Sequence, residues 1–136
     1  MSATQSQWIS PFGDMKVISV DWTAETSGAF TSYTITGCAG MYLLQVETIP
    51  NQERAPTGNY DLTLTDVPGL GATGATIQTI SNQSATAAEV ELQAQVTKPL
   101  DTDLVLAITG NSVDRAKGRV KLYLCANPCA IVAAAS

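Results

Sequence analysis

The sequence predicts an all-β protein, an antiparallel β-sandwich or small β-barrel of about seven strands, with a jelly-roll-like order among the options. Apolar and polar residues alternate with a period of two in repeated segments, as they do in strands with one buried face. Charged residues make up only 14% of the chain, far fewer than a helical bundle carries. The 136 residues, 45% of them hydrophobic, are enough to bury the core of a single domain.

The N-terminal segment, residues 1–14, is mostly polar, and we expect it to form an extended arm. Its anchoring side chains are Trp8, Ile9 and Phe12. Aromatic residues on an arm either pack against their own domain or are buried in a neighbouring protein. These three residues are therefore candidates for binding a partner.

Seven strands are expected in the β domain, residues 15–125. The clearest is 59–66, in which Tyr60, Leu62 and Leu64 alternate with polar residues. The segment 104–109 is apolar on both faces apart from its end, and the segment 119–124 alternates. We expect these last two strands to lie in the centre of a sheet or under a second layer. In order, the segments are 15–23, 32–37, 41–49, 59–66, 89–96, 104–109 and 119–124, separated by turn residues at 27–28, 38–40, 56–59, 66–69, 98–103 and 109–111.

Two further segments lack strand periodicity. Residues 67–88 are rich in Gly, Ala, Ser and Thr, and we expect a long loop of the kind that is functional or ordered by a partner. Residues 126–136 form a small, apolar C-terminal tail that packs either on its own domain or on another subunit. The apolar residues of these segments complete the predicted partner-binding set: Leu70, Ile77, Ile131 and Val132.

Charge excludes one class of partner. The net charge of −5 and the pI near 4.4 disfavour nucleic acid, whose phosphates bind clustered Lys and Arg. The exception is a basic run, which we interpret first as a solvated strand face or a rim of salt bridges, and second as a contact for an acidic protein surface. It consists of Arg115, Lys117, Arg119 and Lys121.

The sequence also predicts a location. The N-terminus has no basic and apolar signal-peptide pattern, and no stretch of about 18 apolar residues exists. We expect a soluble protein made in a cytoplasm, with no membrane partner.

The residues that carry most enzyme chemistry are missing. The chain has no histidine, the usual general acid or base, and no phosphate-binding glycine motif. Asp101 and Asp103 favour turn chemistry over a calcium site, and Glu89 and Glu91 favour the solvent side of a strand. We therefore predict no enzyme, no catalytic residues, no cofactor and no metal.

The cysteines do not form a disulfide framework. Three are present, Cys38, Cys125 and Cys129, so at least one is unpaired. The Cys125–Cys129 spacing allows a disulfide or, less readily, a metal site, but free thiols are the favoured interpretation.

Three motifs connect the chain with a known group. They are APTGNYDLTLTD, followed by a variable Gly-rich stretch, then LVLAITGN, and finally KGRVKLYL. In these motifs residues 15–125 resemble small β-rich virion structural proteins of tailed bacteriophages. The chain departs from that pattern after Asp66, where VPGLGATGA replaces an Asp-Val-hydrophobic-Gly-Gly continuation, and in the tail.

The resemblance implies a non-enzymatic capsid cement (decoration) protein that binds the outer surface of the major capsid shell. The expected location is the virion, with the capsid exterior favoured, and the expected partners are the major capsid protein or another virion protein. A homo-oligomer, with a trimer favoured, is implied as well. The alternatives are a neck, tail or fibre component, or a host- or carbohydrate-binding β module.

Overall fold

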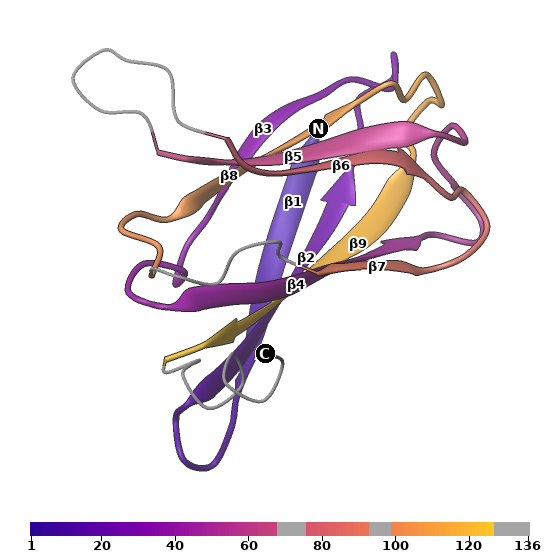
Figure 1. The fold of residues 1–136 in the computed structure, drawn as a ribbon. Helices are drawn as coiled ribbons and strands as arrows, with labels where there is room; N and C mark the ends of the chain where they lie inside the picture. The colour runs from indigo at the N-terminus through magenta and orange to yellow at the C-terminus, as the bar shows by residue number, and fades with distance from the viewer. Residues whose placement is uncertain (68–75, 93–98, 127–136) are drawn as a thin grey trace.

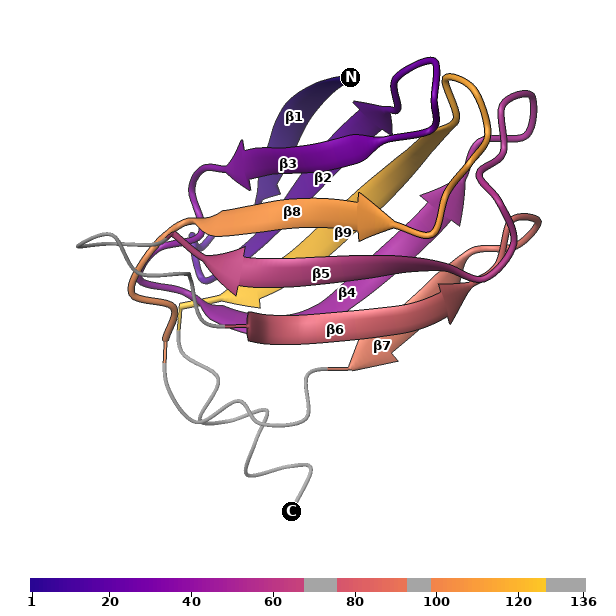
Figure 2. The ribbon, with the colours of Figure 1, turned by 90° about the horizontal axis from the view of Figure 1, so that it is seen from above.

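Nine strands in two antiparallel sheets form a β-sandwich in the computed structural model, which describes residues 1–67, 76–92 and 99–126 (Figure 1). The five-stranded sheet has the order β1 (Ser2–Ile9), β2 (Met15–Thr23), β9 (Lys117–Cys125), β4 (Tyr42–Pro50) and β7 (Glu89–Leu92). The four-stranded sheet has the order β3 (Phe30–Ile35), β8 (Leu104–Thr109), β5 (Tyr60–Asp66) and β6 (Thr76–Gln83), and lies in front in Figure 2.

Strands β2 to β9 pair in a nested order. β2 pairs with β9, β3 with β8, β4 with β7 and β5 with β6, so the chain behaves as one long folded hairpin wrapped into two layers. This is the jelly-roll arrangement, in which successive pairs alternate between the two sheets. The predicted fold class is confirmed, with nine strands in place of seven, and β1 is an addition to the edge of the jelly roll.

The core lies between the two sheets, and at one end of it Trp22 packs edge-on to Phe30 and tilted against Tyr60. Trp22 is 1% exposed, and its ring lies across Gly118 of β9. A Cβ on that glycine would come within 2.8 Å of the indole atoms. The absence of a side chain at position 118 therefore makes room for the largest residue of the core.

One polar pair crosses the core. The Thr48 hydroxyl on β4 donates a hydrogen bond of 2.5 Å to the side-chain oxygen of Gln83 on β6. The Gln83 side-chain nitrogen donates to the Ser81 carbonyl at 3.1 Å. Both residues are buried, so each polar atom depends on this partner, and the bond ties the two sheets in one alignment.

Two segments expected to be irregular are strands. Residues 2–9 of the predicted arm form β1, which pairs with β2 over eight consecutive residue pairs. Residues 76–83, inside the predicted loop 67–88, form β6. The β5–β6 pairing contains two register shifts, and such bulges disrupt the period-two pattern by which a strand is recognised.

The expected strand 89–96 is confirmed over residues 89–92, which form β7, but its predicted orientation is wrong there, and residues 93–96 lie outside the described residues. Val90 pairs with Glu47 on the outer face and is 51% exposed. The Glu89 carboxylate is half-buried and accepts a hydrogen bond of 3.1 Å from the Ser84 N–H. Glu89 therefore anchors the β6–β7 turn and does not lie on a solvated strand face.

Candidate partner-binding surface

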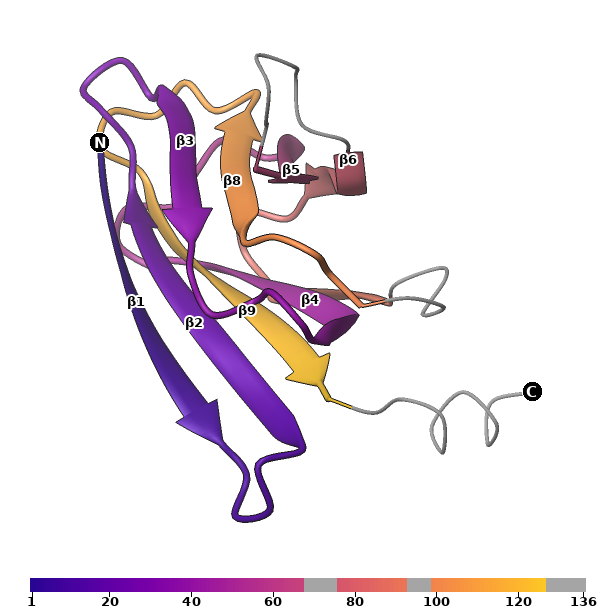
Figure 3. The ribbon, with the colours of Figure 1, turned by 90° about the vertical axis from the view of Figure 1, so that its left-hand side faces the viewer.

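The β1–β2 hairpin projects beyond the rest of the sandwich, as Figure 3 shows. Its turn is built from Ser10 to Gly13, with Pro11 in second place, where its fixed φ favours a β-turn, and Gly13 at φ 72°. The Gly13 N–H donates to the Ser10 carbonyl at 2.9 Å. The Ser10 hydroxyl donates to Asp14 at 2.7 Å and accepts from the Met15 N–H at 3.1 Å. This polar network fixes the turn.

Three apolar side chains are exposed on this fixed hairpin. Phe12 is 92% exposed at the turn, and Trp8 and Ile9, at the end of β1, are 57% and 48% exposed. We call Trp8, Ile9 and Phe12 the hairpin tip. Exposed apolar residues on an ordered protrusion are typical of a binding surface, because water solvates them poorly.

The outer face of the five-stranded sheet continues from the tip. Trp8 pairs with Val17, and Val17 pairs with Tyr123 on β9, so these three residues lie in one row across the sheet. The Tyr123 hydroxyl donates to Glu47 at 3.0 Å, and burial and this carboxylate raise the pKa of the tyrosine. The row is apolar at Trp8 and Val17 and ends in the polar hydroxyl of Tyr123.

The remaining predicted binding residues divide into two groups. Ile77 lies on β6 and packs partly buried against the core, so it is a packing residue in this structure. Leu70, Ile131 and Val132 lie outside the described residues. Of the seven predicted residues, Trp8, Ile9 and Phe12 are thus exposed on one hairpin, with Trp8 and Ile9 on opposite faces of β1. Pro11 and Gly13, two typical turn residues, are the sequence signal that could have predicted this hairpin.

Sequence reasoning missed Gln5, which holds β1 in place. Its side-chain oxygen accepts hydrogen bonds from the Thr36 N–H at 3.0 Å and from the Tyr33 hydroxyl at 3.2 Å. Its side-chain nitrogen donates to the Thr36 carbonyl at 3.0 Å. One amide thereby joins β1 of the first sheet to the end of β3 in the second. A glutamine in a polar strand gives no sequence signal for this role.

Three residues of the basic run, Lys117, Arg119 and Lys121, lie on one face of β9, and Arg115 lies in the turn before it. Arg119 donates two hydrogen bonds to the Asp21 carboxylate, at 2.5 and 3.1 Å, which lower the pKa of Asp21 and raise that of Arg119. Arg115 lies 3.9 Å from Asp114. The charges of these two arginines are therefore balanced by acidic neighbours, in line with a rim of salt bridges.

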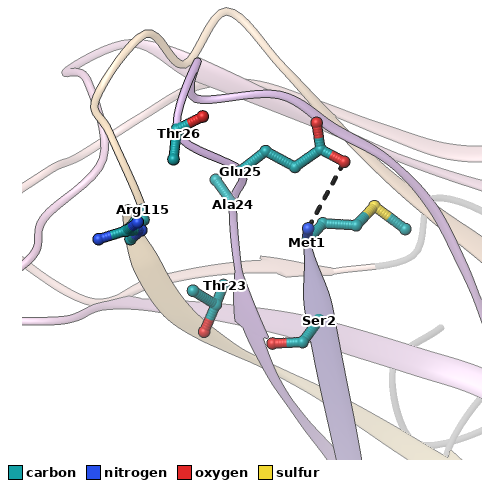
Figure 4. Close-up of a pocket in the computed structure, with 7 residues that line it drawn as sticks. All are labelled: Met1, Ser2, Thr23, Ala24, Glu25, Thr26 and Arg115. Atoms are coloured by element: carbon teal, nitrogen blue, oxygen red, sulfur yellow. Dashed lines mark ion pairs between the residues drawn. The ribbon is translucent and has the colours of Figure 1, made fainter.

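A shallow pocket lies near the start of β1, between the N-terminus and the β2–β3 turn (Figure 4). The Met1 amine is 3.5 Å from the Glu25 carboxylate, and Arg115 lies at the other side. Within the described part of the chain, the one buried side-chain polar atom without a hydrogen-bond partner is Trp22 Nε1, in the core. The pocket therefore offers paired surface charges and hydroxyls and no group prepared for chemistry.

The candidate reactive groups have structural partners. The Asp103 carboxylate accepts hydrogen bonds from the N–H groups of Gly37 and Cys38, at 3.1 and 3.4 Å, and so holds the turn after β3. Burial, followed by the nearby Asp103, raises the pKa of the Cys38 thiol to about 11, which keeps it protonated at neutral pH. Residues 1–67, 76–92 and 99–126 contain no group of three metal-ligating side chains. Cys129, the second half of the predicted pair with Cys125, lies outside the described residues.

The described residues contain no helix long and apolar enough to cross a membrane. No protein-family model and no curated protein sequence matches the chain.

Several solved structures match most of the chain, with TM-scores below 0.5. A chain of the acid-stable capsid of Helicobacter pylori bacteriophage KHP30 is 11% identical, with a TM-score of 0.49, and the match covers 91% of this chain and 93% of that one. The carbohydrate-binding module CBM27-1 of Caldicellulosiruptor saccharolyticus is 10% identical, with a TM-score of 0.46, covering 93% and 83%. A chain of the cyanophage Pam1 capsid is 15% identical, with a TM-score of 0.35, covering 90% and 86%. These chains include phage capsid proteins and a sugar-binding module, and at these values the likeness carries no argument about activity.

Proposed function

We propose that this chain is a non-enzymatic structural protein of a tailed-phage virion, and specifically a capsid cement protein on the outer surface of the major capsid shell. The observation that carries the proposal is the hairpin tip, where Trp8, Ile9 and Phe12 are exposed on a turn fixed by hydrogen bonds. A rigid apolar protrusion binds with little loss of conformational entropy, because the turn is ordered before it docks. The motif resemblance in residues 15–125 gives the class of partner.

The rest of the fold suits a structural role. Buried apolar residues and the Thr48–Gln83 hydrogen bond hold the two sheets of the jelly roll together. Asp103 holds the turn after β3, and burial keeps the Cys38 thiol protonated. The proposal therefore assigns no catalytic residue, cofactor or metal. We place the chain in the virion after synthesis in the host cytoplasm.

Copy number tests the position in the particle. Quantitative mass spectrometry of purified virions, combined with cryo-electron microscopy, would count this chain against the major capsid protein. Hundreds of copies on the shell surface support the cement role. A few copies to a few dozen at one vertex or along the tail support the alternative of a neck, tail or fibre component. Virions that lack the chain would overturn both.

One observation favours a second function. Trp8 and Tyr123 lie in the same row of the outer face, and aromatic side chains on an open sheet face are suitable platforms for sugar rings. Trp22 and Tyr60 are buried in the core, which excludes them from this role. A glycan array tests it: binding that is lost with Trp8→Ala and kept with Phe12→Ala supports a carbohydrate-binding module, and no binding removes the alternative.

A further inference from the structure

The edges of the two sheets differ in how they are protected. β3 contains a register shift between Phe30 and Tyr33, and the β5–β6 pairing contains two shifts. β7 contains two glutamates, Glu89 and Glu91. Bulges and charge are usual devices that keep an edge strand from pairing with another chain. Three of the four edges therefore carry such a device.

β1 carries none of them. It is eight residues long, pairs with β2 without any register shift, and its sequence SATQSQWI contains no charged residue, no proline and no glycine. A long, regular, uncharged edge offers a row of backbone donors and acceptors to a second strand. This contrast between the edges of one molecule indicates that another strand pairs with β1.

The hydrogen-bond pattern shows which backbone groups are offered. The Ser10 N–H donates to the Met15 carbonyl. In an antiparallel pair every second residue bonds to the partner strand, so the even-numbered residues of β1 bond to β2 within the hairpin. By this alternation the backbone groups of Ala3, Gln5, Gln7 and Ile9 point away from β2. The Gln5 side chain is engaged with Thr36, which fixes the strand with these groups facing outward.

We infer that the occupant of this edge is the β1 strand of a second copy of this chain. An antiparallel pair centred on Gln5 sets Ala3 against Gln7 and Gln5 against Gln5, so that outward-facing groups meet outward-facing groups. On the outer face Thr4 lies opposite Ser6, a favourable hydroxyl pair. Identical strands pair in this way only if they do not repel each other, and β1 has no charge to repel.

The neighbouring charges agree with this pairing. On β2 the charged side chains are Lys16 and Asp21, next to Ile9 and Thr4 in the register. Asp21 is neutralised by Arg119, and Lys16 donates to the Gly37 carbonyl at 3.1 Å. The two copies therefore form a two-fold dimer with one continuous ten-stranded sheet, an isologous contact. This dimer is an alternative to the trimer that the sequence resemblance implies, and it does not depend on the position of the chain in a virion.

A charge-exchange experiment tests the inference. One variant carries Thr4→Lys with Ser6→Lys, and another carries Thr4→Glu with Ser6→Glu, so that like charges meet twice across the proposed pair. Sedimentation of the full-length wild-type chain is expected to give a dimer, twice 14.2 kDa. Each variant alone is expected to dissociate at about tenfold or higher concentration than the wild type, and an equimolar mixture to recover the dimer.

The controls separate folding from pairing. Gln45→Lys adds charge to the same sheet face on β4, and is expected to leave the dimer unchanged. Gln7→Pro removes an outward N–H without touching the β1–β2 bonds, and is expected to weaken the dimer even if the lysine variant fails to fold. A monomeric or trimeric wild type overturns the inference, as does a dimer that both edge variants leave intact. Neither result bears on the copy-number test of the proposed function.

Discussion

Two tryptophans on adjacent strands have opposite fates. Trp22 on β2 is 1% exposed and is packed against Phe30, Tyr60 and Gly118, whereas Trp8 on β1 is 57% exposed beside Ile9 and Phe12. The same residue type therefore serves the fold in one place and is left in water in the other. Burial of Trp22 helps to explain why the sandwich is stable. The exposed residues of the hairpin tip add little to stability, so we explain them by a binding partner.

The largest difference is expected between two alanine variants. Trp22→Ala removes a buried ring and leaves a cavity, and should lower the free energy of unfolding by about 3–5 kcal/mol. Trp8→Ala should change it by less than about 1 kcal/mol, since its ring is mostly in water. Urea denaturation of both variants makes the comparison, and equal losses would show that the tip is part of the core.

A smaller effect is expected when the core is overfilled. Gly118→Ala places a Cβ within 2.8 Å of the Trp22 ring, and should cost about 1–3 kcal/mol. Gly58→Ala is the matched control, because nothing lies within 4 Å of its added Cβ. Thermal denaturation should show a lower unfolding temperature for the first variant alone. If position 118 tolerated alanine as well as position 58, the close packing of Trp22 would be wrong.

The bond between the sheets gives an effect of similar or smaller size. Thr48→Val keeps the shape of the side chain but leaves the buried Gln83 oxygen without its donor, at a cost of about 1–3 kcal/mol. Adding Gln83→Leu removes the unsatisfied group and should recover part of the loss. A double variant no more stable than the single one would argue against the bond as the cause.

The smallest effect on stability is expected from the exposed ion pair. The Arg119 hydrogen bonds lower the pKa of Asp21, so the pair stabilises the fold above the ordinary carboxyl pKa of 3.8 and this contribution is lost as the pH falls through the lower folded value. Because both side chains are about half exposed, the contribution is about 0.2–1 kcal/mol. Asp21→Asn should be slightly less stable than wild type at pH 6, and the difference should shrink as the pH falls below 3.8. A difference that does not shrink would assign the loss to another cause.

The sequence predicted the sandwich because apolar and polar residues alternate in most of the expected strands, and Tyr60, Leu62 and Leu64 are buried as their spacing indicated. It missed β1 because the inward residues of an added edge strand, such as Ala3 and Gln5, need not be large and apolar. It missed β6 because bulges place Ile77 and Ile80 three residues apart, out of phase with a regular strand.

The candidate surface was predicted only as a set of apolar residues. Trp8, Ile9 and Phe12 were recognised because apolar residues in a polar segment need burial, but the arm expected around them is a hairpin. Its turn depends on the Ser10 hydroxyl meeting Asp14, and the position of β1 depends on Gln5 reaching Thr36, 31 residues away. Such polar contacts between distant or flexible side chains have no periodicity to read in a sequence.

The most direct measurement compares binding with folding for the hairpin tip. The variant W8S/I9S/F12S and the control Val90→Ser, an exposed apolar residue on β7, would each be added to virions that lack the chain, and the bound copies counted after sedimentation. The proposal predicts that the tip variant loses at least about nine-tenths of its occupancy while its unfolding temperature stays within a few degrees of wild type, and that the control binds normally. Full occupancy by the tip variant would contradict the assignment of this surface.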